Sequence, residues 1–306
     1  MIYRTLGSTD LRVSGIGMGT VQLGMPYGLG KLDPPPQDEA IGLLRAAFER
    51  GVTYIDTAPG YGYSESLVGK AFGDMAEKPM IATKVNLPEE TVTAGLEEQL
   101  EISLRNSLRE LRLEHLELVQ LHSIIGTFVN DELLRALENL QAKGLVKYWG
   151  VTTYGTEAPL DAQRFPECFR VLQVPYNMLD RSLDTVLFPQ LEAHGMGLVL
   201  RSVFLQGVLS ERYLALDSQL APLKEAAQQL ADLAKKSGMT LAQMALRFAA
   251  YSAAVHTTLF GTTMRTELEA NCRIFEMGPL PEDLLSAIRA IEVTDRDLLN
   301  PGNWPS

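Results

Sequence analysis

Residues 53–65, TYIDTAPGYGYSE, contain in one place the unit from which the rest of the chain is built. The run Thr53–Asp56 is short and rich in β-branched and aromatic residues, which is typical of a buried strand. Two glycines and a proline then predict a tight turn, and Ser64 stands where it can cap a following helix. The segment therefore predicts a strand, a turn and a helix, which together make one βα unit.

The same order recurs on both sides of this segment. Apolar runs alternate with amphipathic stretches. The apolar runs have the composition of strands that are buried on both faces. Among the amphipathic stretches Leu96–Leu111 is the clearest, because its leucines form one stripe. The expected strands are Gly15–Gly19, Thr53–Asp56, Met80–Lys84, Leu116–Leu121, Val146–Val151, Val171–Val174, Gly197–Ser202 and His256–Phe260. Eight βα units predict an α/β fold, a closed (β/α)8 TIM barrel, in a single domain of residues 1–306. An open doubly wound sheet is the alternative.

Two additions to the plain repeat are expected. The segment Tyr3–Val13 has the pattern of an N-terminal β-hairpin, which would close the bottom of the barrel. Extra helices are expected between the seventh and eighth strands: Pro222–Lys236, then a second helix that starts at Thr240, where Gln243 completes a capping box. The irregular segment Phe204–Leu220 is the candidate for a mobile loop over a ligand.

The composition excludes several classes of function. The chain of 306 residues has a formal net charge of −11, which disfavours binding to nucleic acid or to anionic membranes. No apolar run approaches the roughly 18–20 residues of a membrane span, and residues 1–13 lack the pattern of a secretory signal. Cys168 and Cys272 form no disulfide framework, so we expect reduced thiols and a cytoplasmic protein. Four histidines without an HxH pair argue against a metal-dependent hydrolase.

Polar residues stand near the carboxyl ends of the expected strands, at intervals close to one βα unit. In order along the chain they are Asp56, Lys84, His122, Thr152 with Thr153, Gln173, Ser202, and Gly261 with Thr262. Barrels of this class carry their chemistry at that end. Because seven strands contribute in register, we expect these side chains to form one site.

Asp56, Tyr61, Lys84 and His122 fit the requirements of proton transfer to a carbonyl oxygen. A phenol has a pKa near 10, and a neighbouring ammonium lowers it. Asp56 would hold Lys84 charged and oriented, and Tyr61 would exchange the proton while His122 binds the same oxygen or shares the proton. A cofactor would supply the hydride.

The order Asp-Thr-Ala-x-x-Tyr-Gly-x-Ser-Glu, followed by Lys and His at the next two strand ends, resembles the aldo-keto reductase superfamily. The resemblance extends from the segment 3-YRTLG-7 to Asn271. It implies the same barrel, and it implies that Asp56, Tyr61, Lys84 and His122 form the catalytic tetrad with the tyrosine as proton donor. It also implies NADP(H), or alternatively NAD(H), as the cofactor.

The resemblance also implies the cofactor contacts. Gly19 and Thr20 would lie near the nicotinamide ribose, with Asp56 beside them. Thr152 and Thr153 replace a Ser-Asn pair that, together with a Gln matched by Gln173, holds the carboxamide. The loop at Ser202, Phe204 and Gly207 would bind the pyrophosphate. Arg201 stands where an aromatic residue commonly stacks on the nicotinamide, and its charge could reach a substrate oxygen or be paired with a neighbouring carboxylate.

The adenosine end would be bound by the segment from Gly261 to Asn271, with Thr262, Thr263 and Arg265 near phosphate. Glu267 occupies the place where relatives that prefer NADP carry Arg or Gln. Its carboxylate would repel a 2′-phosphate and could accept a hydrogen bond from a 2′-hydroxyl, whereas Arg265 and the threonines favour NADP. The sequence therefore favours NADP(H) but leaves NAD(H) open.

The expected substrate is a small carbonyl compound: an aldehyde, a ketone or a sugar aldehyde. Tyr27, Tyr63, Arg201 and Trp304 could line a mixed polar and aromatic pocket suited to a hydroxylated aldehyde. A cofactor-binding redox sensor or regulatory subunit on the same barrel is the alternative function. The physiological substrate, the reaction direction and the oligomeric state are not determined by the sequence.

Overall fold

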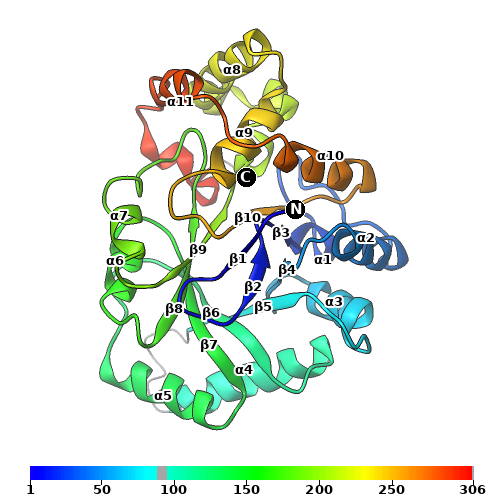
Figure 1. Ribbon diagram of the computed structural model, residues 1–306, viewed down its shortest axis with the longest axis vertical. Helices are drawn as coiled ribbons and strands as arrows, with labels where there is room; N and C mark the ends of the chain where they lie inside the picture. Colours follow the sequence, from blue (N-terminus) through cyan, green and yellow to red (C-terminus); the bar gives the residue numbers. More distant parts are fainter. Residues whose placement is uncertain (88–94, 305–306) are drawn as a thin grey trace.

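Eight parallel strands close into a barrel in the computed structural model, which describes residues 1–87 and 95–304 (Figure 1). The strand order around the barrel is β10-β3-β4-β5-β6-β7-β8-β9, so that each strand lies beside its sequence neighbour and the last pairs with the first. The strands are β3 Ile16–Gly19, β4 Tyr54–Asp56, β5 Met80–Val85, β6 Leu116–Ile124, β7 Val146–Thr153, β8 Phe169–Pro175, β9 Gly197–Arg201 and β10 Thr257–Phe260. The closed barrel is confirmed, and the open sheet is wrong.

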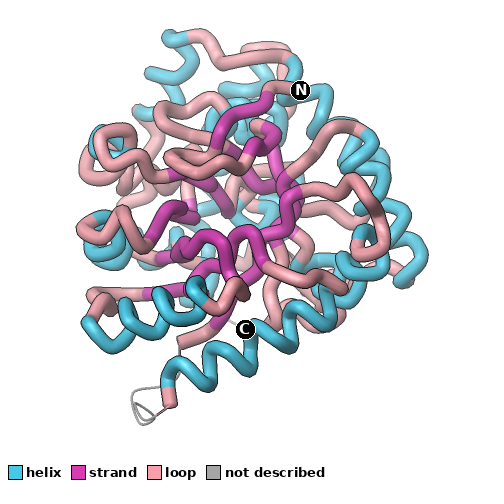
Figure 2. The backbone as a smooth tube through the Cα atoms, turned by 60° about the horizontal axis from the view of Figure 1, so that its bottom comes forward, coloured by secondary structure: helices cyan, strands magenta, loops and turns pink. Residues whose placement is uncertain are grey.

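The helices lie outside the ring of strands, as Figure 2 shows. They are α1 Val21–Gly24, α2 Gln37–Glu49, α3 Ser64–Phe72, α4 Leu96–Leu111, α5 Asp131–Ala142, α6 Glu157–Gln163, α7 Phe188–Leu191, α8 Ala221–Lys236, α9 Leu241–Ala250, α10 Arg265–Glu276 and α11 Glu282–Arg289. The extra helices α8 and α9 stand between β9 and β10, as expected. In α9 the hydroxyl of Thr240 accepts from the Gln243 amide, and the Gln243 side chain accepts in return, which is the predicted capping box. None of the helices in the described ranges is long and apolar enough to cross a membrane.

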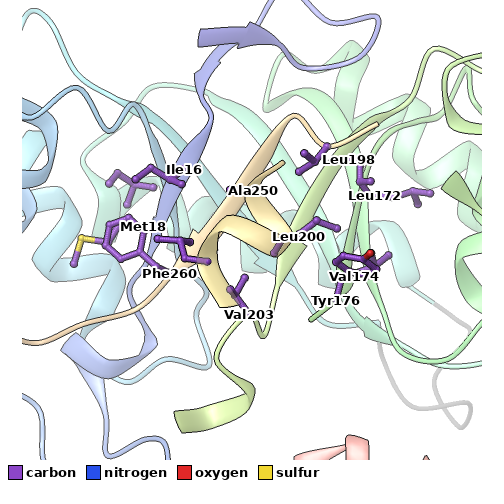
Figure 3. Close-up of a cluster of buried hydrophobic side chains, with 14 of the residues drawn as sticks. Ile16, Met18, Leu172, Val174, Tyr176, Leu198, Leu200, Val203, Ala250 and Phe260 are labelled. Atoms are coloured by element: carbon purple, nitrogen blue, oxygen red, sulfur yellow. The ribbon is translucent and has the colours of Figure 1, made fainter. Parts of the chain in front are cut away.

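A layer of apolar side chains joins the strands to the surrounding helices. In Figure 3 the outward-facing residues of four adjacent strands pack together with Ala250 of α9; the labelled ones are Ile16, Met18, Leu172, Val174, Leu198, Leu200 and Phe260. These side chains are buried because each strand has helices on one side and the barrel interior on the other. This explains why the strands read as continuous apolar runs.

The N-terminal hairpin closes the amino end of the barrel. Strands β1 Tyr3–Thr5 and β2 Arg12–Ser14 pair antiparallel and lie across the near end of the barrel in Figure 1. Leu6 at its turn is fully buried and belongs to one apolar cluster with inward-facing residues near the starts of the barrel strands. Gly7 has φ +57°, and a Cβ there would lie 2.3 Å from the backbone nitrogen of Gly197, so the hairpin docks only with glycine at this position.

The segment Phe204–Leu220 differs from the irregular loop that the sequence predicts. It contains three short 3-10 helices, Leu205–Gly207, Glu211–Ala215 and Ser218–Leu220. Most of its large apolar side chains are buried, with Leu214 exposed; the buried ones are Leu205, Val208, Leu209, Tyr213, Leu216 and Leu220. Two more 3-10 turns, Arg296–Leu299 and Pro301–Asn303, end the described chain. The segment therefore packs as part of the core, and its expected mobility stays a prediction.

Candidate active site

The strand ends bring Asp56 and Lys84 together at the carboxyl end of the barrel, which we call the mouth. The Nζ atom of Lys84 lies 2.6 Å from Oδ1 of Asp56, and the two side chains are 1% and 5% exposed. Lys84 also donates to the backbone carbonyl of Thr57 at 2.8 Å. Burial opposes the charge of Lys84, but Asp56 and the Tyr61 phenol favour it more strongly, so the pKa of Lys84 is raised. Lys84 is therefore a buried ammonium group.

Tyr61 projects over this ion pair from the turn after β4. The Lys84 Nζ atom lies 4.7 Å from the centroid of the Tyr61 ring. Gly62, with φ +58°, allows the turn to touch the backbone of Gly24, because a Cβ on Gly62 would lie 2.2 Å from the Gly24 carbonyl oxygen. The turn is thus fixed against α1, and the phenol ring is held beside the ammonium group.

Three buried hydroxyl groups anchor the far side of the same turn. Ser64 Oγ lies 2.5 Å from Thr20 Oγ1 and 2.9 Å from Thr57 Oγ1. Thr20 in turn donates to the backbone carbonyl of Asp56 at 2.8 Å. Thr20 is fully buried in this cluster and its hydroxyl holds the turn, so its contact with the nicotinamide ribose stays a prediction.

His122 completes the predicted group of four. Its ring lies edge-on to that of Tyr61, with 5.8 Å between centroids. Burial, and then the charge of Lys84, lower the pKa of His122 to about 4, so the imidazole is neutral at pH 7. Asn86, which the sequence analysis did not single out, lies beside it with Oδ1 3.1 Å from Nδ1 of His122. If the amide oxygen accepts from Nδ1, then Nε2 is left as an acceptor.

The second oxygen of Asp56 is held by two amides inside the barrel. Gln173 Nε2 donates to Asp56 Oδ2 at 2.7 Å, and Gln120 Nε2 lies 3.4 Å from the same atom. Gly150 leaves room for Gln120, because a Cβ there would lie 3.2 Å from Gln120 Cγ and 2.8 Å from the Val171 carbonyl oxygen. Gln120 was missed from the sequence, although a glutamine in an apolar run two residues before His122 is a signal.

The other predicted contacts also lie at the mouth. Thr152 accepts from the backbone amide of Ser123 at 2.7 Å, whereas the Thr153 hydroxyl is buried with no hydrogen-bond partner among the described residues. Gly19 ends β3, where a Cβ would meet only the Phe260 carbonyl oxygen at 3.8 Å. The strand ends at Gly19 and Thr153 therefore leave polar or open positions that suit a ligand.

Arg201 ends β9 and lies against Tyr154. The guanidinium carbon is 4.3 Å from the centroid of the Tyr154 ring, and Nη2 donates to the Thr153 carbonyl oxygen at 3.1 Å. Nη1 donates to the Ser202 hydroxyl at 3.1 Å. Within the part of the chain that the structure describes, no carboxylate forms an ion pair with Arg201, so the pairing that the sequence left open is not found.

The loop after Arg201 has an unusual backbone. Ser202, Leu205 and Gln206 have positive φ angles of 61°, 43° and 54°, and Gly207 has φ +111°. Non-glycine residues in this region cost of order 1–3 kcal/mol each and cluster at ligand clamps and active sites. Phe204 lies half-buried against the core within the same loop. The strained loop stands where the predicted pyrophosphate contacts lie.

At the predicted adenosine end, Thr262 and Glu267 bind each other. The Thr262 hydroxyl donates to Oε2 of Glu267 and accepts from the backbone amide of Met264 at 3.0 Å. Arg265 is largely exposed and lies 3.6 Å from Glu269. Next to this segment, Oε1 of Gln22 is buried without a partner in the described chain and would lie 2.2 Å from a Cβ on Gly261. Two other predicted cofactor contacts belong to this segment. Thr263 is half-buried and precedes α10, and Asn271 is buried within α10.

The residues present fit a nicotinamide dinucleotide. The first N–H groups of the twelve-residue helix α10 have no intrahelical partner and can bind phosphate. The unpartnered Thr153 hydroxyl and Gln22 carbonyl supply polar atoms at two parts of the mouth. A separate groove of about 680 Å³ lies at the amino end of the barrel, and none of the predicted tetrad lines it.

The chain belongs to the aldo/keto reductase family, which it matches over residues 15–293. It is therefore an aldo-keto reductase, an NAD(P)-dependent oxidoreductase. It is 27% identical to L-galactose dehydrogenase of Arabidopsis thaliana, over 99% of this chain and 97% of that protein. It is 27% identical to a probable voltage-gated potassium channel subunit beta of Oryza sativa, over 92% and 93%. Its fold resembles an aldo-keto reductase from Bacillus halodurans in its holo form, with a TM-score of 0.77, 25% identity, and 95% and 96% of the chains covered.

Proposed function

We propose that this protein interconverts a carbonyl and its alcohol with Tyr61 as the general acid and base. The observation that carries the proposal is the Lys84 ammonium group, held 2.6 Å from Asp56 and against the face of Tyr61. An ammonium group beside a phenol favours the phenolate, so the phenol can release a proton to the carbonyl oxygen and take it back. Asp56 keeps the ammonium group in place, and both of its oxygens are bonded.

His122 binds the same oxygen in this proposal. Its low pKa leaves the imidazole neutral at pH 7, so it acts as a hydrogen-bond partner and adds no positive charge that would compete with Lys84. The Tyr61 and His122 rings are in edge-on contact, so their polar atoms belong to one part of the mouth and can bind the same carbonyl oxygen. The dinucleotide, when bound, supplies or removes the hydride at the carbonyl carbon.

We propose NADP(H) as the cofactor, with NAD(H) as the alternative. Arg265 at the start of α10 supports a 2′-phosphate, and its only ion pair in the described chain, at 3.6 Å to Glu269, is weak enough to be exchanged. Glu267 supports the alternative, because its carboxylate, which Thr262 holds in place, would repel a 2′-phosphate. The strained loop at Ser202–Gly207 supports a contact with the pyrophosphate of the dinucleotide. The unpartnered Thr153 hydroxyl supports a contact with the nicotinamide carboxamide.

The substrate class is an aldehyde, a ketone or a sugar aldehyde. The similarity to L-galactose dehydrogenase supports a hydroxylated substrate, as do the tyrosines near the mouth. Of the predicted lining residues, Tyr27 is half-buried, while Tyr63 is 69% exposed and Trp304 donates to the Leu298 carbonyl oxygen. A panel of aldehydes and sugars, followed at 340 nm with both dinucleotides, tests the proposal. Steady turnover of at least one carbonyl supports it, and no turnover of any overturns it.

The similarity to a potassium channel subunit favours one second candidate, a cofactor-binding regulatory subunit. Such a protein would oxidise its bound cofactor once and then stop, because release of the product dinucleotide limits it. Multiple turnovers with free cofactor in excess would exclude this candidate. A single stoichiometric burst without steady turnover would favour it.

A further inference from the structure

Arg201 is a half-buried cation at the mouth without a carboxylate partner in the described chain. Its guanidinium uses one N–H on each terminal nitrogen, for Ser202 and for the Thr153 carbonyl. An arginine carries five N–H donors, so three remain. A guanidinium that is partly removed from water is costly unless it is paired, so the unpaired state of Arg201 does not favour stability and suits an anionic ligand.

Among the described residues, the Asp180 carboxylate lies near enough for Arg201 to affect its pKa, but it forms no ion pair with Arg201. Asp180 accepts from the hydroxyl of Ser182 at 2.9 Å and from its backbone amide at 3.4 Å. Burial raises the pKa of Asp180, and the charges of Arg296 and Arg201 oppose this only in part. Asp180 therefore binds its own turn, and the guanidinium of Arg201 stays available.

Arg201 lies across the mouth from the candidate tetrad. The tetrad comes from β4, β5 and β6, whereas Arg201 ends β9, which lies on the other side of the closed strand order. Tyr154 contacts the face of the guanidinium, so the three N–H groups that Ser202 and Thr153 do not use stay available at its planar edge. A ligand with its carbonyl at Tyr61 would therefore extend across the mouth toward Arg201.

We infer that Arg201 is a specificity-determining residue that selects carbonyl substrates carrying an anionic group, a carboxylate or a phosphate. The inference rests on the proposed function and names the class of substrate for that site. A guanidinium matches the geometry of both groups through two parallel N–H bonds. The formal charge of −11 makes this local cation necessary, because the rest of the protein repels anions.

Two matched pairs of substrates test the inference. Glyceraldehyde 3-phosphate is compared with glyceraldehyde, and succinic semialdehyde with butanal, so the two arms separate phosphate from carboxylate. We expect kcat/KM of the wild-type enzyme to favour the anionic member of at least one pair by about 10-fold or more. Arg201→Met should reduce that ratio by roughly 10- to 100-fold, mainly through KM, which is the loss expected for a charge-assisted bidentate bond. Arg201→Lys should retain part of the preference for the anionic substrate, because the ammonium group keeps the positive charge but lacks the two parallel N–H donors of the guanidinium.

Arg164→Met is the matched control. Arg164 also lies over an aromatic ring, with its guanidinium carbon 5.6 Å from the centroid of Phe165, but it pairs with Asp161 after α6 and is largely exposed. We expect this variant to keep the wild-type ratio. Equal use of anionic and neutral members in both pairs would overturn the inference. An equal loss for both members in Arg201→Met would also overturn it, because Arg201 would then serve the cofactor or the loop.

A binding measurement separates failure of this inference from failure of the proposed function. Succinate and inorganic phosphate are titrated by calorimetry into wild type, Arg201→Met and Arg164→Met. Binding of either anion that only Arg201→Met weakens, by about 10-fold or more, supports the inference even if no carbonyl is turned over. Absence of binding to wild type, or equal affinity in all three proteins, overturns it in that case. If Arg201→Met does not fold, the inference is tested by the wild-type preference for the anionic member of each substrate pair and by the reduction of that preference in Arg201→Lys.

Discussion

Lys84 and Asp56 form a buried ion pair whose two members have different surroundings. The ammonium group is nearly enclosed, with the Asp56 carboxylate 2.6 Å away, the Thr57 carbonyl oxygen 2.8 Å away and the Tyr61 ring above it. The carboxylate reaches further into the barrel, where amides from β8 and β6 take its second oxygen. The ammonium group therefore faces the Tyr61 ring, whereas the carboxylate is held by the barrel amides as well as by Lys84.

Tyr61→Phe should lower kcat by roughly 10²- to 10⁴-fold, because a positioned acid–base group contributes about that much. Dinucleotide affinity should stay nearly unchanged, since the ring and its contact with Lys84 are retained. Steady-state rates and a fluorescence titration with each dinucleotide measure the two effects. A variant that keeps a tenth or more of the wild-type turnover would remove Tyr61 from this role.

Lys84→Met should reduce both rate and stability. The change leaves the Asp56 carboxylate buried without its cation, which costs about 3–5 kcal/mol for a pair of this kind. Urea denaturation monitored by circular dichroism gives the free energy of unfolding. Lys70→Met is the control, because the Lys70 ammonium group is exposed and, among the described residues, donates to the neutral side chain of Gln37. Unchanged stability together with full activity in Lys84→Met would mean that the ion pair has no role in either.

His122 should make the folded protein sensitive to acid. The unfolded chain binds the imidazole proton near the ordinary pKa of 6.5, whereas burial and Lys84 lower the pKa in the folded protein to about 4. Stability from the neutral imidazole is therefore complete above pH 6.5 and is lost as the pH falls through 4. The difference amounts to about 3 kcal/mol.

Denaturation of wild type and His122→Gln at pH 7 and pH 4 measures this contribution. The fall in unfolding free energy should be smaller in His122→Gln, by up to about 3 kcal/mol. His115→Gln, at an exposed histidine beside Glu117, should behave like wild type. Identical acid dependence in wild type and His122→Gln would contradict the prediction.

Glu267→Arg should tighten NADP binding and leave NAD binding almost unaffected, because the 2′ substituent is the sole difference between the two ligands. A charge reversal at a partly exposed position should change the preference for NADP over NAD by about 1–3 kcal/mol, which is roughly 5- to 150-fold. Arg265→Ala should move the preference the other way. Fluorescence titrations at fixed ionic strength measure both without a known substrate. Equal changes for the two dinucleotides would show that α10 does not face the 2′ position.

Much of the fold and the candidate tetrad was predictable because both depend on spacing along the chain. The strand runs recur once per βα unit, and Asp56, Lys84 and His122 stand at successive strand ends, so the closed barrel brings them together without knowledge of any side-chain conformation. Tyr61 was predictable because it stands shortly after Asp56 in the sequence, within a glycine-rich turn.

The remaining contacts depend on side-chain directions that spacing does not give. Gln120 has the same strand parity as His122 and therefore points into the barrel, but only the register with Gly150 shows that there is room for it. The bond between Thr262 and Glu267 depends on the extended backbone of Met264 before α10. The hydroxyl of Thr20 turns away from the mouth because Ser64 and the Asp56 carbonyl oxygen bind it.

The N-terminal hairpin determines the end of the barrel at which ligands enter and leave. In the described part of the chain, Leu6 and its neighbours fill the amino end of the barrel, so cofactor, substrate and product share the route to Asp56 and Lys84 through the mouth. A dinucleotide that lies against the strand ends would be covered by the substrate above it. It would therefore bind first and leave last, so compulsory-order kinetics would follow from a hairpin, Tyr3–Ser14, that lies at the opposite end of the barrel from either ligand.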